Sequence, residues 1–283
     1  MEEMPLGVMT WVLGDPYKAV ELAKAVGVKT MQLGCPPDEY YEGEKKEKFK
    51  KFLKESGIKV TTVFCGYEGE NYESMDAIIE TVGFRNPKLR EERIKKTFQI
   101  SDFAKELGVN VIAAHIGFIP EDRNDPIYKG MVETVRKIAD YCKKNGQYFA
   151  LETGQETAEV LLQFIKDVGR DNLRVNFDPA NMLFYGSGDP IEAIEVLKDY
   201  IIGVHCKDYK VPKEGEKPSF ENFVLFGEGD VGAERFVRKL KEIGYKGPLT
   251  IEREVLDFEQ QKNDMIKIKA TLEKIREKVL SSN

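Results

Sequence analysis

The chain has 283 residues, of which 41% are apolar and 33% are charged, a balance typical of a soluble globular protein with a sizeable core. The 49 acidic residues outnumber the 43 basic ones and give a net charge of −6, which argues against a strongly basic nucleic-acid-binding protein. No segment approaches the roughly 18 uninterrupted apolar residues of a membrane span, and the acidic first residues lack the apolar core of a signal peptide.

A short apolar run followed by a helical segment recurs along the chain. We expect eight strands, at Leu6–Trp11, Thr30–Leu33, Lys59–Phe64, Val111–His115, Tyr148–Glu152, Leu173–Phe177, Ile201–His205 and Leu249–Glu252. Most of the helical segments end near a glycine, which adopts positive φ there at no steric cost. The runs are short and alternate little, as expected for parallel strands that are covered on both faces.

Eight strand–helix units in this length predict a single (β/α)8 TIM barrel, and we expect one domain over residues 1–283. A doubly wound sheet is the alternative, but no GxGxxG follows the first strand and no GxxxxGK[ST] occurs. Two connections are too long for plain turns, one from Gly66 to Arg90 with a short helix near Met75–Thr81, and one from Lys207 to Gly232. Because both follow strands, they are candidate lids at the C-terminal face; plain surface loops are the alternative.

Four consecutive predicted strands end in, or are directly followed by, residues of metal-binding types. They are Glu152, Asp178, His205 and Glu252. Each alone has a simpler explanation as a cap, a turn or a core histidine. Together they would converge at the barrel mouth, because neighbouring strands lie about 4.8 Å apart. Three buried carboxylates need a counter-charge, so the pattern predicts a divalent metal site.

The same segments resemble a known family, the xylose isomerase-like barrels described as sugar phosphate isomerases and epimerases. That family includes ketose 3-epimerases and shares a superfamily with endonuclease IV. The resemblance rests on Leu151–Glu156, Asn176–Asn181, Val204–Asp208, Gly227–Asp230 and Thr250–Glu254. It implies that Glu152, Asp178, His205 and Glu252 bind one divalent metal. The ketose 3-epimerases carry His where this chain has Asn181 and Arg where it has Val211.

The expected ligand set is mostly hard, which favours Mn²⁺ or Mg²⁺, with Co²⁺ or Zn²⁺ able to substitute. Such an ion would chelate a keto oxygen and an adjacent hydroxyl, and would stabilise the enediolate formed when the neighbouring C–H loses its proton. We expect Glu152 and Glu252 to form the acid–base pair. Return of the proton to the opposite face of the same carbon gives epimerisation, and return to the adjacent carbon gives isomerisation. The sequence does not choose between these two reactions. The substrate is a keto-sugar or sugar phosphate.

Further side chains near the strand ends are candidates for substrate contacts. They are His115, Lys207, Asn181, Gln155 and Trp11. The simpler alternatives are a buried structural histidine, a solvated lysine, polar residues that order their own loops and a tryptophan of the core. We expect Asp208 to orient Lys207. Glu254 is the rival of Glu252 as fourth ligand, but it lies beyond the strand end.

Three other functions compete with a metal-dependent isomerase or epimerase. A dehydratase of a keto-sugar or keto-inositol would use the same site. An abasic-site endonuclease is disfavoured, because such relatives use several histidines for three zinc ions and this chain has two histidines. A non-catalytic sugar-binding barrel would not need two carboxylates beside the metal. We expect no nucleic-acid or membrane partner and leave a homo-oligomer open. The four cysteines lack CxxC spacing, which favours free thiols in the cytoplasm.

Overall fold

Eight parallel strands close into a barrel in the structure, a computed structural model that describes residues 3–11 and 14–281. Its neighbouring strands run in the order β1-β10-β7-β6-β5-β4-β3-β2. They are β1 Leu6–Thr10, β2 Thr30–Gly34, β3 Lys59–Phe64, β4 Val111–Ala114, β5 Tyr148–Glu152, β6 Leu173–Phe177, β7 Ile201–Cys206 and β10 Leu249–Ile251. The predicted (β/α)8 fold is confirmed. Each expected strand lies within one residue of its observed bounds, so Trp11, His115 and Glu252 stand just after their strands rather than on them.

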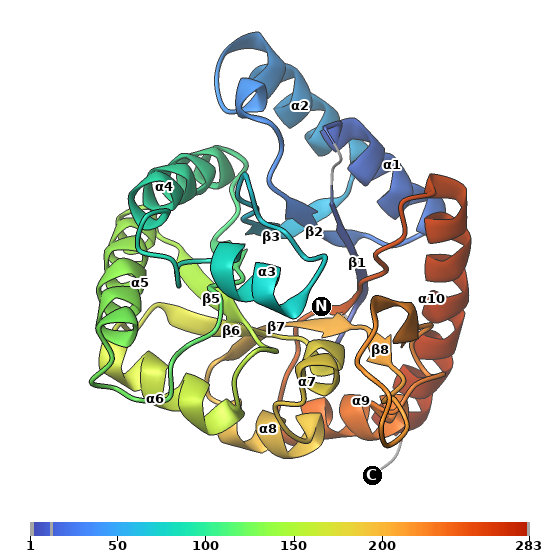
Figure 1. Cartoon of the computed structure of the whole chain (residues 1–283). Helices are drawn as coiled ribbons and strands as arrows, with labels where there is room; N and C mark the ends of the chain where they lie inside the picture. Colours follow the sequence, from blue (N-terminus) through green and yellow to red (C-terminus); the bar gives the residue numbers. More distant parts are fainter. Residues whose placement is uncertain (1–2, 12–13, 282–283) are drawn as a thin grey trace.

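Helices surround the barrel, and α3 lies across its end inside the ring of outer helices (Figure 1). The helices are α1 Pro16–Val26, α2 Gly43–Ser56, α3 Met75–Thr81, α4 Arg90–Glu106, α5 Pro126–Lys144, α6 Ala158–Val168, α7 Pro179–Tyr185, α8 Pro190–Leu197, α9 Ala233–Glu242 and α10 Phe258–Ser281. Four of them begin with an Asp-Pro pair, in which the aspartate accepts backbone N–H groups and the proline needs no partner. None of the helices in the described ranges has the length and apolar character that crossing a bilayer requires.

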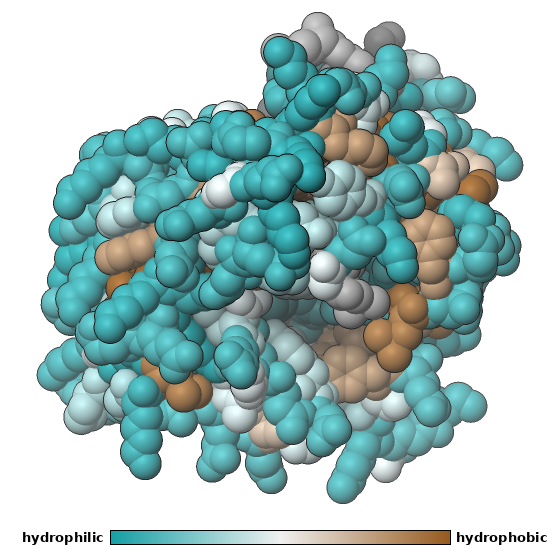
Figure 2. Space-filling view, turned by 90° about the horizontal axis from the view of Figure 1, so that it is seen from above, coloured by the Kyte–Doolittle hydropathy of each residue, from teal (hydrophilic) through white to brown (hydrophobic). Residues whose placement is uncertain are grey.

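The surface in Figure 2 is mostly hydrophilic and is hollowed at one place, with hydrophobic side chains along one margin of the hollow. Beneath the C-terminal end of the strands, Phe64 belongs to a small buried cluster with Met9, Ala113 and Ala150. The Phe64 ring centroid lies 5.6 Å from that of His205 and 5.9 Å from that of Trp11. This phenylalanine therefore forms an apolar floor under the strand ends.

The connection from β3 to α4 contains α3, over the residues that the sequence predicts. A largely buried glutamate holds its two ends together, since the Glu70 carboxylate accepts the N–H of Gly83 at 2.9 Å and that of Tyr67 at 3.2 Å. Arg93 donates to the carbonyls of Gly83 and Glu68 from the other side. A Cβ on Gly83 would lie 2.0 Å from the carbonyl carbon of Ile116, so only glycine fits this crossing. The connection is therefore tied to the barrel at its base.

The connection after β7 forms a small hairpin that the sequence pattern did not predict. Its strands, β8 Asp208–Tyr209 and β9 Phe223–Val224, pair antiparallel. The Asp208 carboxylate accepts the N–H groups of Gly227, Gly229 and Val231 at 2.8–3.1 Å, and that of Tyr209. The expectation that Asp208 orients Lys207 is therefore wrong. Its carboxylate is occupied by the backbone of the loop that returns to the barrel.

Candidate metal and active site

Four buried side chains from neighbouring strand ends meet at the C-terminal mouth of the barrel. Ligand-type atoms of Glu152, Asp178, His205 and Glu252 all lie within 4.8 Å of one another. The Nδ1 atom of His205 is 3.0 Å from Glu152 Oε1, 3.1 Å from Glu252 Oε2 and 3.4 Å from Asp178 Oδ2. The structure thus brings together the four residues that the sequence singles out. We call this group the four-residue cluster.

The two carboxylate oxygens of Asp178 have different roles, since one caps a helix and the other belongs to the four-residue cluster. Oδ1 caps α7, accepting the N–H of Ala180 at 2.8 Å and that of Asn181 at 3.0 Å. Oδ2 is buried without a hydrogen-bond partner and faces His205. The turn-forming and metal-binding interpretations of Asp178 are therefore compatible, because each uses a different oxygen.

The His205 ring is fixed from behind by two polar residues that the sequence reasoning missed. Its Nε2 lies 2.8 Å from Gln32 Oε1 and 3.2 Å from Asn176 Nδ2, and Gln32 Nε2 donates to Asn176 Oδ1 at 2.9 Å. With Nε2–H donating to Gln32, the lone pair of Nδ1 points into the cluster, as a metal-binding imidazole requires. Gly203 leaves room for this arrangement, since a Cβ there would lie 2.4 Å from Asn176 Oδ1. A polar residue in the middle of a short, mostly apolar strand was the available signal for Gln32.

The donor set fits a divalent cation. Asp178 Oδ2, His205 Nδ1 and Glu252 Oε2 are all buried and lack a hydrogen bond of good geometry. Three atoms of this kind within one small space are costly unless a cation binds them. Carboxylate oxygens with one imidazole suit Mn²⁺, Mg²⁺ or Zn²⁺.

Burial and the neighbouring charges together shift the pKa values of the two glutamates in opposite directions. Burial raises the pKa of Glu152 above its usual value, although His115 and His205 act against it. Burial acts the same way on Glu252, but His205 and Lys207 outweigh it and lower its pKa. Burial lowers the pKa of His205, yet the carboxylates of Glu252 and Glu152 raise it well above its usual value. A proton and a metal ion therefore compete for Nδ1.

Two expected substrate contacts, Asn181 and Lys207, lie directly beside the cluster. Asn181 Nδ2 donates to Glu152 Oε1 at 3.3 Å, and its Oδ1 accepts from Lys207 Nζ at 3.4 Å. Lys207 Nζ is buried, 3.2 Å from Glu252 Oε2 and 2.5 Å from Glu254 Oε2. Glu254 is half exposed and binds Lys207 instead of joining the cluster.

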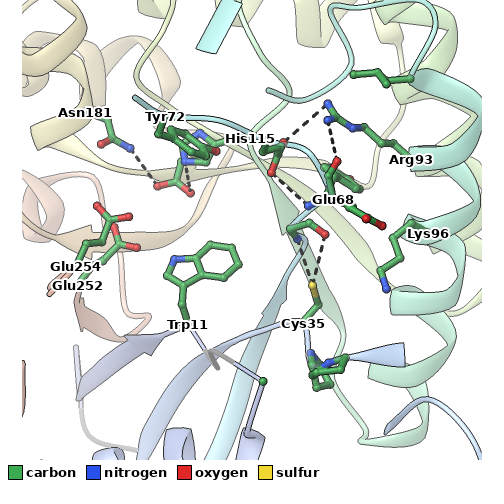
Figure 3. Close-up of a pocket in the computed structure, with 18 of the residues that line it drawn as sticks. Trp11, Cys35, Glu68, Tyr72, Arg93, Lys96, His115, Asn181, Glu252 and Glu254 are labelled. Atoms are coloured by element: carbon green, nitrogen blue, oxygen red, sulfur yellow. Dashed lines mark hydrogen bonds and ion pairs between the residues drawn. The ribbon is translucent and has the colours of Figure 1, made fainter. Parts of the chain in front are cut away.

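A cavity of about 890 Å³ opens above the cluster and is lined by Trp11, His115, Asn181 and Lys207 among others. His115 Nε2 lies 3.6 Å from Glu152 Oε2. Trp11 lies in the middle of the cavity, between the part next to the four-residue cluster and the part next to α4 (Figure 3). Gln155 is not among the described residues that line this cavity. Tyr72, from the connection that carries α3, does line it and had not been singled out from the sequence.

Glu156 is a buried carboxyl close to the site in sequence, and it yields a stability prediction. Burial raises its pKa to about 8, so the folded protein holds the neutral acid and must bury a charge at higher pH. This contribution to stability is complete below pH 4.5 and is lost as the pH rises through about 8. We expect Glu156→Gln to change stability little at pH 5 and to raise the free energy of unfolding by up to about 5 kcal/mol at pH 9.

Denaturant unfolding of both proteins at the two pH values measures this effect. Glu159→Gln, at an exposed position on the adjoining helix, is the matched control for the loss of one carboxylate. Equal stability differences at pH 5 and pH 9 would contradict the assignment of a neutral Glu156.

Comparisons with known proteins agree with this architecture. The sequence pattern of the xylose isomerase-like TIM barrel family matches residues 20–277. A xylose isomerase domain protein from Planctomyces limnophilus is 38% identical, with a TM-score of 0.93 over 99% of this chain and 100% of that one. An uncharacterized protein of Methanocaldococcus jannaschii is 28% identical over 69% of each chain. A D-tagatose 3-epimerase-like protein is 23% identical, with a TM-score of 0.74 over 98% of each chain.

More distant solved structures of the same fold include epimerases of D-psicose and L-ribulose and a probable dehydratase. One such structure is described with bound zinc and another with magnesium. The match of the family pattern over most of the residues, with the closed barrel that it describes, shows that the chain belongs to the xylose isomerase-like TIM barrel family.

Proposed function

We propose that this protein is a divalent-metal-dependent sugar isomerase or epimerase. The observation that carries the proposal is the pair Glu152 and Glu252, which flank His205 at the base of the cavity. Glu152 is the last residue of β5 and Glu252 comes directly after β10, and these strands are separated in the barrel by β6 and β7. The two glutamates therefore approach the cluster from different sides, as proton transfer on two faces of one carbon requires.

Glu152, Asp178, His205 and Glu252 would hold the metal, for which Mn²⁺ is the ion to test first. When bound, a divalent cation supplies polarisation of a ketone oxygen and stabilises negative charge on it. We assign to Glu152 the removal of a proton from one face of the sugar, and to Glu252 its delivery to the other face. Lys207 lies beside Glu252 and can balance negative charge that develops on the substrate. His115 and Asn181, on either side of Glu152, can bind sugar hydroxyls.

The test is incubation of the Mn²⁺-loaded protein with a panel of ketoses in D₂O, followed by NMR. Deuterium should enter the carbon next to the ketone, and the epimer or aldose should accumulate. Removal of the metal with EDTA should abolish the exchange, and Mn²⁺ should restore it. Exchange that survives exhaustive chelation would contradict the proposal.

The second candidate function is a dehydratase of a keto-sugar or keto-inositol. It is favoured by Lys207, whose buried ammonium, 3.2 Å from Glu252 Oε2, can donate a hydrogen bond to a leaving hydroxyl. The same NMR experiment separates the two functions, because a dehydratase product has lost water whereas an epimer keeps all its oxygen atoms and differs only in configuration and in the deuterium it gains.

A further inference from the structure

The cavity above the four-residue cluster is larger than one sugar ring needs. Its volume of about 890 Å³ lies near the upper end of the roughly 300–1,000 Å³ of pockets that hold drug-sized ligands. Much of its lining comes from the connections after β2 and β3 and from α4, on the far side of Trp11 from Glu252 (Figure 3). We call this part the outer groove, defined by Cys35, Asp38, Glu68, Glu92, Lys96 and Gln99.

One face of α4 supplies the outer groove with polar groups. Glu92, Lys96 and Gln99 are spaced by four and three residues, so they lie along the same side of the helix. Glu92 and Gln99 are exposed, and all three line the cavity. They offer a carboxylate, an ammonium and an amide in one row. Sugar hydroxyls both donate and accept hydrogen bonds, so a row of this kind suits a polyhydroxy group.

Trp11 forms a fixed flat wall at the junction between the cluster and the outer groove. A Cβ on Gly34 would lie 2.6 Å from its indole Cε3, and one on Gly66 would lie 3.2 Å from Cζ3, so the ring packs directly on the ends of β2 and β3. Phe64 contacts it edge-on from below. The side chain is nevertheless 37% exposed. An indole held in this way can stack on the apolar face of a sugar that passes over it.

The charges of the cavity favour a neutral ligand over a phosphorylated one. Among the described residues that line it, seven are acidic and four are basic, so a divalent cation would not make the lining positive. Lys96 is paired with Asp38, and Arg93 lies 4.0 Å from Glu70. Lys207 is paired with two glutamates, and Lys95, the remaining basic residue of the lining, is exposed to water. A phosphate group in the outer groove would therefore be repelled by the carboxylates that lie beside these cations.

We propose, building on the function proposed above, that the substrate is a neutral glycoside of disaccharide size. Its keto-bearing unit lies at the four-residue cluster, and its second sugar unit lies in the outer groove. The glycosidic linkage between the two units passes over the indole ring of Trp11.

Trp11 is the only tryptophan of the chain, so its fluorescence reports binding in this cavity directly. The Mn²⁺-loaded protein is titrated with D-fructose, D-fructose 6-phosphate and two neutral ketose disaccharides, isomaltulose and lactulose. At least one disaccharide is expected to bind about tenfold more tightly than D-fructose, and the phosphate ester no more tightly than D-fructose. Equal or weaker binding of both disaccharides, preference for the phosphate ester, or no saturable change with any disaccharide would overturn the proposal.

Variants locate the second sugar unit. Glu92→Gln and Gln99→Ala should reduce the ratio of disaccharide affinity to D-fructose affinity towards one. Glu91→Gln is the matched control: it is the same substitution one residue away, at a position outside the cavity lining and beside Lys137. It should keep the wild-type ratio. An unchanged ratio in both groove variants would place the second unit elsewhere and overturn the assignment.

The deuterium-exchange experiment keeps this proposal separate from the proposed function. Preferential disaccharide binding without exchange into any sugar would contradict the isomerase and leave the glycoside site standing. Exchange into D-fructose with no preference for either disaccharide would leave the isomerase standing and remove the glycoside site.

Discussion

The Asp178→Asn protein is expected to fold normally and to bind Mn²⁺ at least about 100-fold more weakly than the wild type. The magnitude follows because even changes to groups behind metal ligands cost about 10–100-fold in affinity. Asparagine is as good a helix N-cap as aspartate, so the hydrogen bonds to the N–H groups of Ala180 and Asn181 can persist. What is lost is the negative charge on the oxygen that faces His205. Isothermal titration with Mn²⁺ and metal content after dialysis measure the effect.

Asp189→Asn is a closely matched control. Asp189 also precedes a proline, and its carboxylate caps α8 by accepting the N–H groups of Ile191 and Glu192, in the way that Asp178 caps α7. It lies outside the four-residue cluster, so its variant should bind Mn²⁺ like the wild type. Glu152→Gln should show the same loss as Asp178→Asn. Wild-type affinity in both cluster variants would show that the metal, if bound, is bound elsewhere.

The barrel and the cluster could be predicted because both follow from local patterns that repeat. Each strand is a short apolar run followed by a helix, and the strand ends of a closed parallel barrel must meet at one face. Four metal-binding residue types at equivalent points of successive units were therefore enough to predict that Glu152, Asp178, His205 and Glu252 converge. That prediction required no knowledge of side-chain orientation.

Other features depend on contacts between distant segments, which local patterns do not contain. Gln32 meets His205 across 173 positions of sequence, through the barrel interior. The role of Asp208 was misassigned because its carboxylate turns away from Lys207 toward amides about 20 residues later. The outer groove likewise exists because α4 packs beside the connections that follow β2 and β3. A polar row on one helix face predicts only a solvated surface until that packing is known.

Glu252→Gln is expected to reduce net epimerisation by about 10²–10⁴-fold, the usual contribution of a positioned acid–base group. If Glu152 and Glu252 serve opposite faces, Glu152 can still remove its own proton and exchange it with solvent. The variant should therefore retain slow deuterium incorporation into one epimer and lose it in the other. Glu152→Gln should show the complementary preference. NMR of each epimer in D₂O gives both rates.

Both glutamates are also expected to be metal ligands, so the metal content must be measured beside the rates, and only metal-replete samples compared. Glu254→Gln is the informative comparison, because Glu254 contacts Lys207 and stands outside the cluster. It should lower the rates of both epimers together, since it alters a neighbour of the site and neither proton-transfer group. Two results together would assign the acid–base role to Glu254 instead. The metal-replete Glu252→Gln protein would catalyse epimerisation at nearly the wild-type rate, and the Glu254→Gln protein would lose deuterium exchange in only one of the two epimers. The selectivity between epimers, rather than the size of the rate loss, is therefore the measurement that assigns each glutamate to a face of the sugar.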